Sequence, residues 1–332
     1  MKQRIAYLDV LRVLACCMVV LMHTPHPDAG VPGYVQVPLY FLTAIGLVSF
    51  FMVSGALLLP TNLTASEFMK RRLGKIGGPW LFWTLFYVFI LVPDEGLSVD
   101  WVWQRFVSVL SPGTHIMWFM LTLAGLYLIT PILTPFVKNA TEKELRIYLG
   151  IWFISLLLPW IPSLASLFES ITGPLYYLSG YIGYFLLGYY IHTYRPNAAQ
   201  YFYIIVTLSL IARYFYSIEE GKRATDLFWY LSIPVALMSM SWFSLVQKKC
   251  IAMGAKYNYI QLLSDCCFGI YLVHFFIMRQ ILWRFDFIIY SCGWIGQVVL
   301  TWLLTMLISF GITYVISFLP GAEYIIGYRN KK

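Results

Sequence analysis

Residues 5–24, IAYLDVLRVLACCMVVLMHT, decide the class of fold. The run is almost wholly apolar, and a helix needs about 20 such residues to cross the hydrocarbon core of a bilayer. Asp9, Arg12 and His23 interrupt it. Ionisable side chains are costly inside a membrane, and they normally face a bundle interior or a wet cavity. The run therefore predicts a membrane-spanning helix with polar groups turned toward protein.

The whole chain has the composition of this first run. Hydrophobic residues make up 60% of the 332 positions and charged residues 11%, whereas a soluble domain carries about 25% charged residues. We therefore expect an all-α polytopic membrane protein, a single bundle of about ten transmembrane helices over residues 1–332. The other candidate spans are 37–60, 79–93, 116–136, 147–166, 175–194, 200–217, 227–247, 259–279 and 290–319.

The basic residues predict the orientation of this bundle. With the N-terminus inside, sixteen of the 23 Lys and Arg residues fall on inner segments and six on outer ones. The remaining one, Arg12, lies within the first predicted span. Cytoplasmic loops carry an excess of such cations, so we expect both termini in the cytoplasm. The net charge of +8 is then mostly a topology signal, and no nucleic-acid partner is expected.

The polar residues of the first run share one side of the predicted helix. Asp9 and Arg12 are three residues apart, close enough to pair. Arg12 and His23 are eleven residues apart, which brings them to one face at about 16 Å along the axis. Two readings stay open for these residues. They form a catalytic or binding site, or Asp9 and Arg12 are a structural ion pair and His23 an interface residue.

A second polar cluster lies in FMKRRLGKIGGPW, residues 68–80, on the predicted cytoplasmic side. Its cations are Lys70, Arg71, Arg72 and Lys75. Arginine clusters bind phosphate through forked hydrogen bonds, but such a cluster is also an ordinary topology signal that contacts anionic lipid head groups. Residues 77–79, Gly-Gly-Pro, are expected to break the helix that precedes the third span.

Other polar groups stand in runs that should be dry. Three histidines, His23, His115 and His274, fall near the predicted outer ends of spans, which suggests a common site. The remaining candidates are Ser54, Trp118 and Tyr271. The six cysteines and five histidines show no metal-ligand spacing, so no metal is expected.

These motifs, taken together, resemble the acyltransferase 3 family of bacterial membrane O-acyltransferases. L-D-x-L-R-x-L-A…V-V-L-M-H is similar to the first helix of that family, whose R/K-x10-H signature has the spacing of Arg12 and His23. The likeness continues, in order, in FFMVSG (50–55), F-x-x-R-R-x-x-K…P (68–79), HIMWFM…LYLITP (115–131), YFLLGYY (184–190) and FGIYLVH (268–274). Cys267, where the family usually has Ser, and Lys75, where Arg is common, depart from the pattern. In length the chain is similar to the enterobacterial common antigen O-acetyltransferase type.

The resemblance implies transfer of an acyl group, usually acetyl, from acyl-CoA to a hydroxyl of a cell-surface polysaccharide or lipid-linked glycan. The enzyme would lie in the bacterial cytoplasmic (inner) membrane among its lipids, with acetyl-CoA as donor substrate and no bound cofactor. His23 and Arg12 would be catalytic, and the cations that hold acyl-CoA would be Arg71, Arg72 and Lys75. The supporting residues would be Asp9, Ser54, His115, Trp118, Tyr271 and His274.

A transporter or exporter of a polar solute or glycolipid is the alternative. Transporters also hold ionisable residues near mid-membrane, but many are built from internal repeats with broken helices at matching places. No such repeat is apparent in this sequence. The oligomeric state is left open by the sequence.

Overall fold

The computed structural model describes residues 4–90, 98–111, 116–157, 160, 180–220, 228–253 and 258–330. Every regular element within these ranges is a helix and none is a strand, so the all-α expectation is confirmed for them. His115, one of the three outer histidines, lies outside the described residues.

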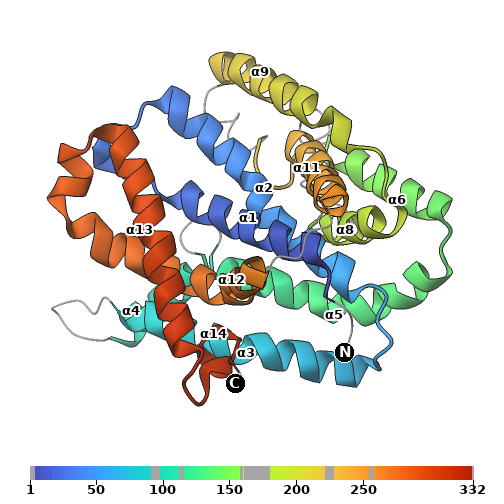
Figure 1. Ribbon diagram of the computed structural model, residues 1–332, viewed down its shortest axis with the longest axis horizontal. Helices are drawn as coiled ribbons and strands as arrows, with labels where there is room; N and C mark the ends of the chain where they lie inside the picture. Colours follow the sequence, from blue (N-terminus) through green and yellow to red (C-terminus); the bar gives the residue numbers. More distant parts are fainter. Residues whose placement is uncertain are drawn as a thin grey trace.

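Twelve labelled α-helices form the described bundle (Figure 1). They are α1 (Ala6–His23), α2 (Gly33–Leu58), α3 (Ala65–Phe89), α4 (Val99–Leu110), α5 (Trp118–Asn139), α6 (Glu142–Ser155), α8 (Ile182–Tyr194), α9 (Phe202–Glu220), α11 (Ile233–Ala252), α12 (Asn258–Phe276), α13 (Gly293–Ile316) and α14 (Ala322–Ile326).

Helix α1 occupies the centre of the bundle. It contacts α2, α11, α12 and α13, and Figure 1 shows it crossing the middle of the molecule with these helices around it. Leu8, Leu11, Ala15 and Val20 are almost fully buried on it. A helix that is enclosed in this way can hold polar side chains at defined positions, because its neighbours leave it little freedom to move.

Helices α2 and α8 approach each other unusually closely. A Cβ at Gly55 would collide with the backbone carbonyl of Phe185, and one at Gly188 would collide with that of Met52. Small residues let helix backbones come together in membranes, where van der Waals packing rather than hydrophobic burial drives association. This contact anchors α2, which forms a wall of the candidate site.

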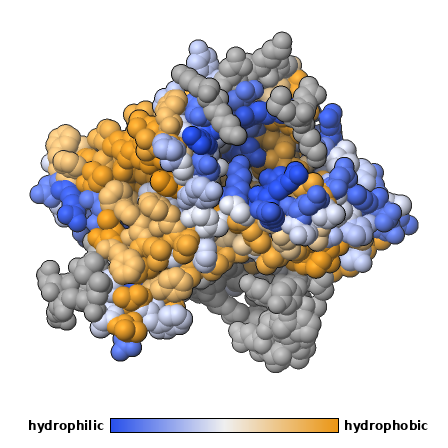
Figure 2. Space-filling model, turned by 90° about the horizontal axis from the view of Figure 1, so that it is seen from below, coloured by the Kyte–Doolittle hydropathy of each residue, from blue (hydrophilic) through white to orange (hydrophobic). Residues whose placement is uncertain are grey.

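Five helical runs of the described chain are long and apolar enough to cross a membrane. They are α1, α2, α5, α13 and Tyr259–Arg284, which contains all of α12 but its first residue. A sixth counts if α8 and α9, bent by 120° at their junction, are one span. Figure 2 shows apolar residues over broad parts of one face, with hydrophilic residues gathered in its middle and at its edge. The expected count of about ten spans and the cytoplasmic termini remain predictions.

The third predicted span needs correction, because its helix starts much earlier. Helix α3 begins with a capping box formed by Thr64 and Glu67 and runs through Gly77, Gly78 and Pro79 without a break. Tertiary contacts override the local signal here: α3 packs along α14, and the Trp83 indole donates a 2.8 Å hydrogen bond to the carbonyl of Ile325. The cation cluster therefore lies on a continuous helix.

Helix α13 faces the bundle through a polar stripe. Its buried residues recur every fourth position, and they are Gln297, Thr301, Thr305, Ser309 and Thr313. Gln297 donates hydrogen bonds to the carbonyl of Thr24 at 2.8 Å and to the Thr301 hydroxyl at 3.2 Å. Interhelical hydrogen bonds and small residues are typical of helix contacts in membranes, so the apolar residues of α13 are left for its outer face.

Candidate active site

Two cavities lie along the same side of α1, one near each end. His23 lines the first and Arg12 lines the second, and we call them the His23 cavity and the Arg72 cavity. The predicted separation of about 16 Å along the helix axis thus places the two residues in different chambers. Residues of α12, and residues that follow it in the chain, line another side of both cavities.

The His23 cavity has a volume of about 700 Å³ and a lining rich in aromatic residues. Its aromatic residues are Tyr40, Trp118, Tyr181, Trp229, Tyr230, Tyr271, Phe275 and Trp283. Trp118 packs on Tyr181 and Tyr230, with ring centres 6.0 and 5.8 Å apart. His23 itself is half-buried, and its ring is perpendicular to that of Phe275, with ring centres 5.8 Å apart. This lining suits a molecule with apolar faces and hydroxyl edges.

His274 lies behind His23 rather than in the cavity wall. Their ring centres are 5.6 Å apart, and His274 is completely buried. The Nδ1 of His274 lies 2.6 Å from the carbonyl of Tyr271, so this nitrogen carries the proton of a neutral ring and donates it. The Nε2 is then an acceptor. His23 and His274 are therefore neighbours, whereas His26 and His192 line neither cavity.

The Arg72 cavity is smaller, about 210 Å³, and has several charged side chains in its lining. Arg12, Arg72 and Lys75 contribute three cations to its lining, against one carboxylate from Asp265. Ser54, Ser264, Tyr127 and Tyr328 add hydroxyl groups. An excess of cations with neighbouring hydroxyls favours a multiply charged anion such as a phosphate ester. Arg71 is exposed on α3 and is absent from this lining.

A buried carboxylate organises the floor of the Arg72 cavity. Asp9 accepts hydrogen bonds from Arg4 at 2.6 Å and from the Ser264 hydroxyl at 2.7 Å, and Arg12 lies at 3.4 Å. The predicted Asp9–Arg12 pair is present, but Arg4 is the nearer cation. The bond to Asp9 raises the pKa of Arg4, and Asp265, 3.0 Å from Arg4, raises it further. Arg12 is thus left with its guanidinium available to the cavity.

Tyr271 lines both cavities and so lies where they meet. Its hydroxyl donates a hydrogen bond to the carbonyl of Ile116, and its ring packs on Phe119 at 5.2 Å. Ile116 belongs to the His23 cavity and Phe119 to the Arg72 cavity. A molecule that occupied both chambers would pass beside Tyr271.

The sequence-predicted residues therefore divide between two places. His23, Trp118 and Tyr271 line the first cavity, and Arg12, Ser54, Arg72, Lys75 and again Tyr271 line the second. Sequence reasoning missed Arg4, Ser264 and Asp265. The pair Ser264-Asp265 does interrupt an apolar run, which is the same signal that Asp9 gives in the first span. Within the described residues, no cluster of three or more His, Cys, Asp or Glu side chains could hold a metal ion.

Comparison with known proteins gives one match. The model of the acyltransferase 3 family, described as an acyltransferase domain, matches residues 5–320. This range includes the described lining of the His23 cavity and most of that of the Arg72 cavity, while Arg4 and Tyr328 lie just outside it. No curated protein and no solved structure matches the chain.

Proposed function

As this chain belongs to the acyltransferase 3 family, it is a membrane acyltransferase, and we propose that it carries an acyl group from acyl-CoA to a carbohydrate hydroxyl. We propose acetyl as the acyl group. The acceptor is a cell-surface polysaccharide or a lipid-linked glycan, and the membrane is the bacterial cytoplasmic membrane. The observation that carries the proposal is the pair of cavities that share Tyr271, one lined by cations and the other by His23.

The Arg72 cavity suits the phosphates of the donor. Guanidinium groups such as those of Arg12 and Arg72 can bind phosphate oxygens through two parallel hydrogen bonds, and Lys75 adds a third positive charge. The distance of about 16 Å from Arg12 to His23 along α1 is comparable with an extended pantetheine arm. We therefore propose that the arm passes Tyr271 and brings the thioester to His23.

The proposed reaction at His23 is direct acyl transfer. The imidazole takes the proton from the acceptor hydroxyl, and the oxygen attacks the thioester carbonyl carbon. Collapse of the tetrahedral intermediate forms the ester and breaks the carbon–sulfur bond, and the CoA thiolate leaves and takes up a proton. Histidine suits this role because its unperturbed pKa near 6.5 lets it accept and return a proton at neutral pH.

The neighbouring groups have proposed supporting roles. His274 packs 5.6 Å from His23 and can fix the orientation of the base, and Trp118 provides a flat face for a sugar ring. Asp9 holds Arg12 and Ser264 at the floor of the other cavity. His115 stays a candidate from the sequence alone.

Thiol release from acetyl-CoA tests the proposal against a transporter. Purified protein in detergent, given acetyl-CoA and a crude extract of surface glycan, should free CoA, and Arg72→Met should free much less. A transporter would free none. Mass analysis of surface glycans from wild-type and deletion cells, beginning with enterobacterial common antigen, should show the loss of acetyl groups from one glycan. Unchanged masses together with no CoA release would refute the proposal.

A further inference from the structure

Four cysteines gather where α1 packs against α12. Cys16 and Cys17 are neighbours on α1, and Cys266 and Cys267 are neighbours on α12. The thiol of Cys16 donates to the backbone carbonyl of Cys267 at 3.8 Å, and it is also a hydrogen-bonding partner of the Cys267 thiol. Both side chains are almost fully buried. We call Cys16 and Cys267 the thiol pair.

The thiol pair lies between two other contacts of the same two helices. Toward one end, Arg12 donates a hydrogen bond to the Ser264 hydroxyl at 3.4 Å. Toward the other end, the ring centres of His23 and His274 are 5.6 Å apart. Along α1, Cys16 is about one turn from Arg12 and about two turns from His23. Contacts on both sides thus hold α1 and α12 in the register that brings the two thiols together.

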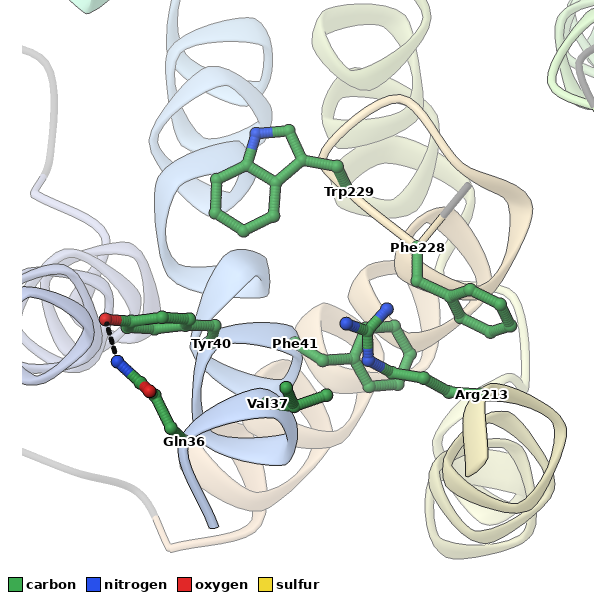
Figure 3. A pocket seen from close by; sticks show the side chains of 7 residues that line it. All are labelled: Gln36, Val37, Tyr40, Phe41, Arg213, Phe228 and Trp229. Carbon is green, nitrogen blue, oxygen red and sulfur yellow. Dashed lines mark hydrogen bonds between the residues drawn. The ribbon is translucent and has the colours of Figure 1, made fainter. Parts of the chain in front are cut away.

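The Arg72 cavity gives access to the thiol pair, because Cys267 is part of its lining. The His23 cavity has no cysteine among its described lining residues. The same holds for a hollow of about 230 Å³ that shares Gln36, Tyr40 and Trp229 with it. Figure 3 shows this hollow and the hydrogen bond from Gln36 to Tyr40. Of these three spaces, the Arg72 cavity is the one from which a small reagent reaches the pair.

We propose that the thiol pair is an oxidative modification site, at which hydrogen peroxide forms a disulfide bond between α1 and α12. The sulfur of Cys267 attacks one peroxide oxygen and becomes a sulfenic acid, and the other oxygen leaves as water with the thiol proton. The sulfur of Cys16 then attacks the sulfenic sulfur. The sulfur–sulfur bond forms, and the sulfenic hydroxyl leaves with the Cys16 proton as a second water. One peroxide is reduced for each pair of thiols oxidised.

The disulfide alters the Arg72 cavity, and this part of the inference rests on the proposed function. A disulfide holds its sulfur atoms about 2.05 Å apart, which is closer than two sulfur atoms that are merely in contact. Its formation draws the Cys267 side chain toward α1, about one turn from Arg12. Since the proposed function assigns Arg12 to the phosphates of the donor, we expect the oxidised protein to bind acetyl-CoA more weakly.

Peptide mapping of the full chain in detergent tests the modification site. The protein is treated with hydrogen peroxide, its remaining thiols are blocked, and its peptides are analysed by mass spectrometry without reduction. We expect a disulfide within the chain that joins Cys16 to Cys267, with the loss of two of the six free thiols and their return after dithiothreitol. Retention of all six thiols, pairing of any other cysteines, or a bond between two chains would overturn the site.

The adjacent cysteines provide the matched control. Cys17→Ser combined with Cys266→Ser leaves the thiol pair intact, so the disulfide should form as in wild type. Cys16→Ser should abolish it. The double variant keeps the proposal testable where Cys16→Ser does not fold, because both reacting side chains are native in it. Absence of the disulfide from a folded double variant, or an equal loss of thiols in Cys16→Ser, would contradict the pairing.

Equilibrium binding of acetyl-CoA before and after peroxide tests the effect on the cavity. Binding by wild type should weaken by about 10-fold, as for the loss of one hydrogen bond to a charged group, and should recover with dithiothreitol. Binding by Cys16→Ser should not respond to peroxide. A disulfide that forms without weakening the binding would overturn the effect on the cavity. Reduced wild-type protein that forms the disulfide but binds no acetyl-CoA would refute the proposed donor and leave the modification site standing.

Discussion

The Arg72 cavity and the His23 cavity share helices α1, α2, α5 and α12 but differ in the number of charged side chains on their walls. The first places Arg12, Arg72 and Lys75 against the carboxylate of Asp265, with hydroxyls between them. The second is wide and aromatic, with His23 as its titratable group on α1. The difference teaches that one end of α1 is suited to a highly charged molecule and the other to a molecule with flat faces and hydroxyl groups. The most sensitive tests alter one cavity and measure a property of the other.

Replacement of His23, the proposed base, should have the largest effect on acyl transfer. His23→Ala should lower acyl transfer at matched membrane levels by about 10²–10⁴-fold, the usual contribution of a positioned general base. Binding of acetyl-CoA should stay within a factor of about two, because the Arg72 cavity is untouched. The measurement is transfer of labelled acetyl to the native glycan, beside equilibrium binding of acetyl-CoA.

His26→Ala is the control for that variant. His26 packs on Trp283 with ring centres 4.6 Å apart but does not line the cavity, so its loss should leave most of the transfer. Near-normal transfer by His23→Ala would rule it out as the base and would direct attention to His115 and His274.

Two adjacent arginines of α3 should differ in their effect on binding at the proposed donor site. Arg72→Met should weaken acetyl-CoA binding by about 10–100-fold, the value of a charge-assisted hydrogen bond of about 1.5–3 kcal/mol. Arg71→Met removes the same charge from the same turn of α3, but Arg71 does not line the cavity, so binding should change much less. Equal weakening by the two variants in an equilibrium binding assay would mean that the cluster acts only by its net charge.

The smallest expected effect is on the stability of the folded protein, when the residues around Asp9 at the floor of the Arg72 cavity are replaced. Arg4→Ala removes the nearest cation from buried Asp9 and should destabilise the folded protein by about 1–3 kcal/mol. Arg12→Ala should cost less, because Arg4 and Ser264 still hold the carboxylate, yet it should lose more activity. Thermal unfolding in detergent, compared with transfer activity, checks this reversal. A larger stability loss in Arg12→Ala than in Arg4→Ala would contradict it.

The sequence predicted the parts of this site that depend on one helix. The eleven-residue spacing of Arg12 and His23 places them on one face because helix geometry is regular over that distance. The apolar runs predicted about ten spans, and five of these match helical runs of the described chain that are long and apolar enough to cross a membrane. Neither signal needs knowledge of which helices are neighbours.

Features that depend on pairing between distant segments could not be predicted in the same way. Arg4 donates a hydrogen bond to Asp265, which lies 261 positions further along the sequence, and no local pattern indicates that contact. Pro79 suggested a helix break, but packing against α14 keeps α3 continuous. The division of Arg71 from Arg72 depends on the rotation of α3, which only its neighbours fix.

Sealed membrane vesicles of opposite orientation test the central claim most directly, because acetyl-CoA added outside cannot cross them. The account predicts that labelled acetyl enters the glycan only when acetyl-CoA is on the side that bears the N-terminus and the Arg72 cavity. The labelled glycan should be enclosed on the other side, next to His23. Equal labelling from the His23 side, or labelling only when donor and glycan share one side, would contradict a reaction that joins the two cavities.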